Sequence, residues 1–265
     1  MPEAPLTPDK RTLDIDPEGI AAPPRAPFIE LGLASCFSFL RGASDAVDLV
    51  LTAHAHGYDA VGIADVNSMA GVVRLHTEAT TLKLRPVIGC RIETVEGLAF
   101  LAYPEDRAAY GRLCRLISAG RMQTPEGEWQ DKGVCQITLA MLAAHCAKDG
   151  EGGVQLILLP PDDLAARFTI QVESNVVPFR RPGPDPEPLA DNDPDLRRDD
   201  EREMAFPDLL PHLARQLPSL GHIAAAYLYR GDDIARIERL DSLGRTHGLT
   251  LLATTDVQYH VPERR

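Results

Sequence analysis

The chain has 265 residues, of which 44% are hydrophobic and 25% charged, and its formal net charge at pH 7 is −12. This composition is ordinary for a globular protein, and no apolar run approaches the ~20 residues that a membrane-spanning helix needs. The first residues have no apolar core after a basic start, so we expect no signal peptide and a cytoplasmic location. The net acidity argues against a protein that holds nucleic acid on its own, since such proteins usually carry a basic face.

Two segments are predicted to lie outside the folded core. Residues 1–27 contain seven of the 22 prolines, and residues 171–204 contain six more, with ten acidic residues against five arginines. Neither segment has apolar periodicity, so we expect a disordered proline-rich leader at 1–27 and a disordered acidic loop at 171–204. The remainder, 28–265, is predicted to form one domain around that loop.

The cysteines are predicted to be reduced thiols. Their number is odd and no two are spaced as CxxC, so neither a disulfide framework nor a cysteine-based metal site is expected. The five are Cys36, Cys90, Cys114, Cys135 and Cys146.

Short apolar runs alternate with helical patterns along the chain. The runs suited to buried strands are Phe28–Leu33, Ala60–Ala64, Pro86–Cys90, Leu98–Tyr103, Val154–Leu159, His222–Leu228 and Leu251–Thr255. Apolar residues recur three and four apart, as in helices, over Ala46–His56, Met69–Leu82, Asp106–Ser118, Thr138–His145, Phe206–Leu217 and Asp232–His247. Gly57 and Gly248 stand where a left-handed residue ends a helix.

This alternation predicts an α/β fold. Strands that are hydrophobic throughout and joined by helices form largely parallel sheets covered on both faces. About seven strands in roughly 200 ordered residues favour a barrel over an open sheet. In such barrels, functional side chains lie where the strands end.

Two carboxylates follow predicted strands at equivalent ends. Asp65 comes directly after Ala60–Ala64, and Asp256 comes directly after Leu251–Thr255. Carboxylates in this position can bind a metal ion or act as a base. For Asp65 the alternative is helix capping, because Asp is a favoured N-cap residue and a helical pattern follows. His260 lies four residues after Asp256 and could face the same pocket.

Several strings resemble the PHP (polymerase and histidinol phosphatase) domain family. The residues that carry the resemblance are Ser38–Ser44 (SFLRGAS), Pro86–Cys90, Tyr110–Ser118 and Leu252–His260. Within that family, these strings resemble the N-terminal PHP domain of bacterial error-prone DNA polymerase, a family-C enzyme of the alpha-subunit type. The resemblance implies a distorted seven-stranded (β/α) barrel of the PHP type, mostly parallel.

The resemblance also implies a metal cluster, often zinc or manganese, that hydrolyses phosphoesters in active members. Here the family's HxH motif falls on Gly32 and Ala34, and its Asp-His falls on Asp65 and Val66. The Glu after the third strand aligns with Arg91. The closing Asp-x-His aligns with Asp256 and Gln258. Only Asp65 and Asp256 could still ligate metal, and two oxygen ligands do not hold a zinc cluster. We expect Arg91 to pair with Asp65 or Asp256, and we expect no cofactor.

The resulting hypothesis is a catalytically inactive structural or interaction domain of an error-prone polymerase, an enzyme of DNA repair and translesion synthesis. Its expected partners are the polymerase core, in the same or a companion chain, and proteins of the mutagenesis complex. DNA would be contacted only indirectly and no membrane is involved. One alternative is a metal-dependent phosphoesterase or 3′–5′ exonuclease that uses zinc or manganese. Another is a module that binds a phosphate ligand through Arg91.

Overall fold

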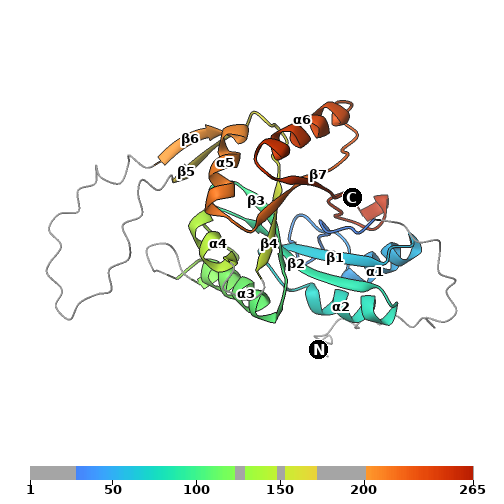
Figure 1. Cartoon of the computed structure of the whole chain (residues 1–265). Coiled ribbons are helices and arrows are strands. Elements are labelled where there is room, and N and C mark those ends of the chain that lie inside the picture. Colours follow the sequence, from blue (N-terminus) through green and yellow to red (C-terminus); the bar gives the residue numbers. More distant parts are fainter. Residues whose placement is uncertain (1–27, 123–128, 148–152, 172–200, 265) are drawn as a thin grey trace, which may run out of the picture.

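The computed structural model describes residues 28–122, 129–147, 153–171 and 201–264. These residues form a mixed α/β fold with a curled, mostly parallel sheet (Figure 1). The predicted leader at 1–27 lies outside the described residues. In this part of the chain, no helix is long and apolar enough to cross a membrane.

The main sheet has six strands in the order β1-β2-β3-β4-β7-β8. Three pairings are parallel (β1 with β2, β4 with β7, β7 with β8) and two are antiparallel (β2 with β3, β3 with β4). The strands are β1 (Ala60–Val66), β2 (Arg85–Glu93), β3 (Ala99–Pro104), β4 (Val154–Leu159), β7 (Leu220–Ala225) and β8 (Thr250–Ala253). The sheet is curled as a half-barrel, and six of the seven predicted strands are present.

The first predicted strand, Phe28–Leu33, is not formed as a strand. Its only ladder contact is a single parallel bridge between Glu30 and Val61. The segment nevertheless lies beside β1, because Gly62 and Ala64 donate their N–H groups to the carbonyls of Glu30 and Leu33 at 2.7 and 2.8 Å. Its pairing with β1 is therefore too irregular to count as a seventh strand.

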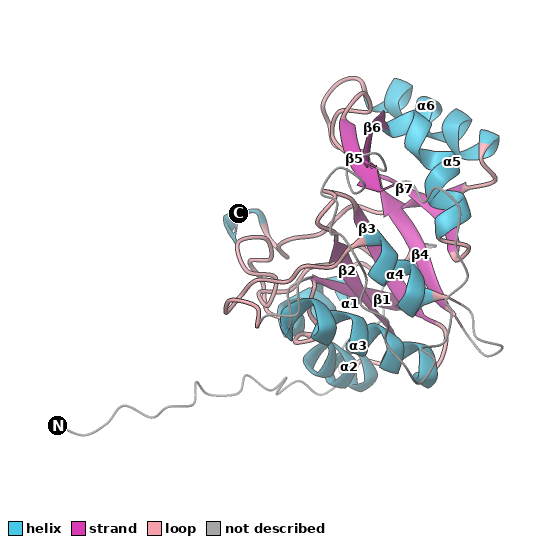
Figure 2. Cartoon of the chain, turned by 90° about the vertical axis from the view of Figure 1, so that its left-hand side faces the viewer, coloured by secondary structure: helices cyan, strands magenta, loops and turns pink. Residues whose placement is uncertain are grey.

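Helices cover the outer side of the sheet, and all six lie where the apolar periodicity predicts them. They are α1 (Ala46–Ala55), α2 (Val72–Thr81), α3 (Arg107–Met122), α4 (Leu139–Cys146), α5 (Phe206–Gln216) and α6 (Asp233–Thr246). Contacts place α2 against β1 and β2, α3 against β3 and β4, and α6 against β7 and β8. Gly57 and Gly248 follow α1 and α6 with φ of 76° and 73°, which confirms both as left-handed helix ends. In Figure 2 the loops gather at one side of the sheet, near the end marked C.

A two-stranded antiparallel hairpin stands apart from the main sheet. It consists of β5 (Arg167–Gln171) and β6 (Glu201–Ala205), with α5 packed against both strands. The disordered acidic loop predicted at 171–204 is therefore too long at both ends, because Gln171 lies in β5 and residues 201–204 lie in β6. Its interior, 172–200, lies outside the described residues.

The inner face of the sheet holds a small apolar cluster. Its buried members are Ala64, Leu101, Tyr103, Ile157 and Ala224. The hydroxyl of Tyr103 donates a hydrogen bond to the carbonyl of Leu31, so this ring crosses β2 and β1 and fastens the N-terminal segment. Burial raises the pKa of Tyr103 well above 10, and the nearby Glu30 adds to the rise. Gly62 and Gly89 make room for the ring, because an added Cβ would come within 2.9 Å of the Tyr103 hydroxyl and 2.5 Å of its ring.

The substitution Gly89→Ala is expected to lower the free energy of unfolding by about 1–3 kcal/mol, the usual cost of overpacking a core. The new methyl group would meet rigid ring carbons of Tyr103, and the ring is tied at its hydroxyl. Gly221→Ala is the matched control on another strand, since its Cβ would meet only the end of Gln155, at 4.0 Å. Urea unfolding of both variants checks this, and equal stabilities would contradict the packing described.

The five cysteines are all unpaired, and Cys90 and Cys146 are buried. Burial raises the pKa of Cys146 to about 12 and that of Cys90 further. Both thiols therefore stay protonated at pH 8, and only the thiolate reacts with disulfide reagents. Cys36 is exposed, although partial burial and the nearby Asp45 and Asp65 raise its pKa as well.

Thiol labelling of the folded protein at pH 8 is accordingly expected to modify Cys36 ahead of Cys90 and Cys146. Those two should react only after denaturation. Peptide mapping by mass spectrometry distinguishes the sites. Labelling of Cys90 in the folded protein at the rate of Cys36 would show that the core around β2 is not packed as described.

Candidate functional site

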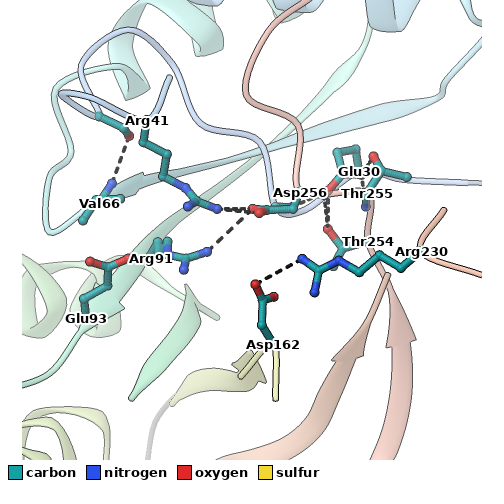
Figure 3. A network of polar contacts seen from close by, with 12 residues as sticks. Glu30, Arg41, Val66, Arg91, Glu93, Asp162, Arg230, Thr254, Thr255 and Asp256 are labelled. Carbon is teal, nitrogen blue, oxygen red and sulfur yellow. Dashed lines mark hydrogen bonds and ion pairs between the residues drawn. The ribbon is translucent and has the colours of Figure 1, made fainter. Parts of the chain in front are cut away.

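A buried carboxylate, Glu30, fastens the N-terminal segment to the chain that follows β8. Glu30 is 2% exposed, and its carboxylate accepts hydrogen bonds from the backbone N–H groups of Gly32 and Thr255 at 2.5 and 2.7 Å. The hydroxyls of Thr254 and Thr255 donate two more, each at 2.5 Å. These four donors offset the cost of burying the carboxylate. Figure 3 shows Glu30 beside both threonines.

Gly32 and Ala34, at the family's HxH positions, are buried where the N-terminal segment meets the chain that follows β8. A Cβ on Gly32 would come within 2.5 Å of the Thr254 hydroxyl oxygen and 3.3 Å of the Asp256 backbone. Ala34 is 1% exposed and donates its N–H to the carbonyl of Val257 at 2.8 Å. The close approach of the two segments therefore occupies the space that an imidazole at position 32 would need.

Asp65 is buried at the end of β1 and its oxygens are occupied by protein donors. It accepts hydrogen bonds from the Ser35 N–H at 2.8 Å, the Ser35 hydroxyl at 2.9 Å and the Ser38 hydroxyl at 2.7 Å. The N–H of Gly71, the N-cap residue of α2, donates another at 3.2 Å. Asp65 is thus not the N-cap itself, as the capping alternative proposed. It accepts the N–H of that residue and holds the loop that contains Ser35 and Ser38.

Asp256 is held by two arginines. One Nη of Arg41 lies 2.5 Å from both of its carboxylate oxygens, and one Nη of Arg91 lies 3.6 Å away (Figure 3). Arg91 also donates from Nε to Glu93 at 2.8 Å. Asp256 has φ of 51°, in the left-handed region that Asp tolerates better than most residues. Of the two partners expected for Arg91, the structure places it near Asp256.

Side-chain alternation explains why Arg91 does not meet Asp65, although their strands are neighbours. Asp65 is two residues after Ile63, which packs in the cluster between β1 and helices α1 and α2. Arg91 follows Cys90, which pairs with Asp65 in register. The Cys90 side chain packs in the apolar cluster between the sheet and helices α3, α4 and α5. Successive side chains on a strand point to opposite faces, so Asp65 faces the helices and Arg91 faces the inner side.

The remaining sequence-predicted residues are divided between two places. Gln258 lines a cavity of about 510 Å³ together with Arg41, Arg91 and Asp256. His260 lies elsewhere, because its Nδ1 is 2.8 Å from the Ser44 hydroxyl and it lines a different cavity beside α1. The expectation that His260 faces the pocket of Asp256 is therefore wrong. Val66 donates its N–H to the Ser38 hydroxyl at 3.1 Å.

The residues present do not fit a metal cluster. The oxygens of Asp65 accept hydrogen bonds from Ser35, Ser38 and Gly71, while Asp256 lies between two guanidinium groups. A fixed cation such as Arg91 beside the site repels a metal ion. Across residues 28–122, 129–147, 153–171 and 201–264, no group of three or more His, Cys, Asp or Glu side chains could hold a metal ion.

Sequence reasoning missed four residues of this region: Glu30, Ser35, Ser38 and Arg41. Glu30 carried a usable signal, since it is a lone acid within an otherwise apolar run. A buried acid of this kind must be matched by donors nearby. Ser38 and Arg41 lie inside the family string SFLRGAS, but their contacts with Asp65 and Asp256 span 27 and 215 residues. Nothing local in the sequence indicates those pairings.

The chain is similar to several bacterial polymerases over most of its length. It is 37% identical over 239 residues to an error-prone DNA polymerase of Caulobacter vibrioides. It is 34% identical over 261 residues to another from Rhodopseudomonas palustris. Each match covers 90% of this chain but only 18% and 21% of the relative, so the chain spans about one fifth of these proteins.

Solved structures share the fold at low sequence identity. A protein from Bifidobacterium adolescentis, assigned as a metal-dependent phosphoesterase, superposes with a TM-score of 0.54 at 14% identity, covering 91% of this chain and 90% of its own. An amidohydrolase from Chromobacterium violaceum, whose structure holds a sulfate and no metal, superposes with a TM-score of 0.52 at 11% identity and covers 87% of both chains. The PHP domain family model matches residues 30–171, more than half of the sequence. The chain belongs to the PHP domain family.

Proposed function

We propose that this PHP domain is a non-catalytic part of an error-prone DNA polymerase and supports the polymerase body. The single observation that carries the proposal is the state of the two remaining carboxylates. Asp65 is occupied by serine hydroxyls and backbone N–H groups, and Asp256 is paired with Arg41 and Arg91. Both groups therefore stabilise the fold where active family members would use them for chemistry.

At three of the family's lost ligand positions, the residues present here make or permit structural contacts. Gly32 permits the close approach of Thr254, and Ala34 bonds to the backbone of Val257. Arg91 supplies a positive charge on the inner face, in the place of the family's glutamate. A guanidinium next to Asp256 contributes the attraction that a metal ion would otherwise provide.

Exposed apolar residues support a docking role. In the loop that precedes Arg41, Phe37, Phe39 and Leu40 are 44%, 87% and 92% exposed. Adjoining exposed side chains of this size are typical of interaction surfaces. We propose that the polymerase body, in the same or a companion chain, covers them. A role in DNA repair or translesion synthesis and a link to mutagenesis-complex proteins belong to the same proposal, which rests here on the names of the relatives.

The experiment is metal analysis combined with hydrolysis assays. The full chain is purified without chelator, dialysed against Zn²⁺ or Mn²⁺, and measured by inductively coupled plasma mass spectrometry. We expect less than one tightly bound metal per chain. We also expect no hydrolysis of p-nitrophenyl phosphate or of the 3′ end of a labelled single-stranded oligonucleotide, because no ligand set holds the ions that would activate water.

Two variants make this result decisive. Asp65→Asn removes a carboxylate at the family's ligand position, and Asp241→Asn removes one that pairs with Arg245 on the surface of α6. More than one tightly bound metal per chain would overturn the proposal. So would hydrolysis that is lost in Asp65→Asn and retained in Asp241→Asn, since that result would assign a metal-dependent phosphoesterase or exonuclease.

A further inference from the structure

A second cavity lies beside α1, and the chain that follows β8 runs between it and the cavity of Asp256. Along this segment, Asp256 and Gln258 line the cavity described above, whereas Val257 and Tyr259 line the second one. Residues of α1, β1 and the N-terminal segment form the remaining walls, and the volume is about 240 Å³. The second cavity is therefore a separate space with its own lining.

Aromatic side chains make up much of this lining. The four that line the cavity are His56, Tyr58, Tyr259 and His260. The centroid of the Tyr58 ring lies 5.6 Å from that of Phe28, edge to face, and 6.0 Å from that of His56. The Ser44 hydroxyl oxygen lies 2.8 Å from Nδ1 of His260 and accepts its backbone N–H at 2.9 Å. Rings from two separate segments thus line one small cavity, and neighbouring groups hold them in place.

Glu30 gives the cavity a negative charge. Among the described residues that line it, Glu30 is the one carboxylate, and none is a lysine or an arginine. The four donors to Glu30 are two backbone N–H groups and two hydroxyls, all of them neutral. They stabilise the carboxylate without cancelling its charge. That charge acts on the lining, because burial and, to a lesser degree, Glu30 raise the pKa of Tyr58.

These features favour a cation that donates no hydrogen bonds. Each oxygen of Glu30 already accepts two hydrogen bonds, which is its full capacity, so a further N–H donor finds no free lone pair. A quaternary ammonium ion needs none, since the negative charge and the faces of aromatic rings attract it.

The size and the apolar part of the lining fit such an ion. Its methyl groups can pack against aliphatic side chains. Those that line the cavity are Leu33, Leu49, Ala53, Val61 and Val257. The volume of about 240 Å³ is smaller than the ~300–1,000 Å³ typical of pockets for drug-sized molecules, so the ligand must be small.

We propose that this cavity binds a small quaternary ammonium ion such as choline, with its methyl groups against Tyr58 and Tyr259 and its charge near Glu30. The proposal goes beyond the proposed function, because it assigns a ligand to a part of the domain that neither the docking loop nor the family's ligand positions form. It requires no metal and no reaction.

The test is saturation-transfer NMR of the full chain with choline, at pH 8 and constant ionic strength in sodium chloride. We expect saturable binding with a Kd below about 10 mM. The neutral analogue 3,3-dimethylbutan-1-ol has carbon in place of the choline nitrogen and therefore the same shape without the charge. It should bind at least about tenfold more weakly, because it lacks the attraction to the rings and to Glu30.

Three variants locate the site. Tyr58→Leu should weaken choline binding about tenfold, since leucine fills space without a π face, whereas Tyr58→Phe keeps the ring and should stay within about twofold. Tyr227→Leu is the matched control, because it removes a tyrosine that is 52% exposed and does not line the cavity. Thermal unfolding confirms that each variant is folded, and Tyr259→Leu replaces Tyr58→Leu if the latter is not.

Four outcomes would overturn the proposal. The first is no saturable binding of choline up to about 10 mM. The second is equal binding of the neutral analogue, which would make the cavity merely apolar. The third is an equal loss of affinity in Tyr58→Leu and Tyr227→Leu, which would show that choline binds elsewhere. The fourth is tighter binding of a trimethyllysine peptide than of choline, which would assign a modified protein in place of a small molecule. None of these readouts involves metal or hydrolysis, so failure here leaves the proposed function untouched.

Discussion

The ion pair between Asp256 and two arginines joins three segments of the chain, and the rest of this region depends on it. Arg41 comes from the loop after the N-terminal segment, Arg91 from the inner face of β2, and Asp256 from the chain that follows β8. The side chains of Arg41, Arg91 and Asp256 are 22%, 15% and 31% exposed. Partial burial makes such a pair stronger than one at the surface, and removing one partner leaves a charge without compensation.

Two further buried carboxylates complete this arrangement on either side. Glu30 fastens the N-terminal segment to Thr254 and Thr255, and Asp65 holds the Ser35–Ser38 loop against α2. Hydrogen bonds thus connect the N-terminal segment to β1 on one side and to the chain after β8 on the other. In this chain the family's ligand positions take part in a polar connection between segments, and the proposed non-catalytic role rests on that connection.

Much of the fold could be predicted from the sequence, because its signals are local. The helices follow from apolar residues three and four apart, and Gly57 and Gly248 follow from the conformation that a helix end requires. The segment 28–33 was less predictable, since its apolar pattern is strand-like but its pairing with β1 is irregular. At the site, the sequence indicates Asp65, Asp256 and the pairing of Arg91 with one of them, but not the contacts of Arg41, Ser35 and Ser38. Contacts such as Arg41 with Asp256 depend on tertiary folding, and which face of a strand Asp65 occupies depends on its register.

Arginine and serine donors occupy the carboxylates that metal ions would need. The most direct test is a crystal structure of the full chain grown with zinc or manganese, with anomalous scattering measured at the metal absorption edge. We expect no anomalous peak at Asp65 or Asp256, and we expect Arg41 to remain paired with Asp256. A strong peak within coordination distance of either carboxylate, with Arg41 displaced, would contradict it.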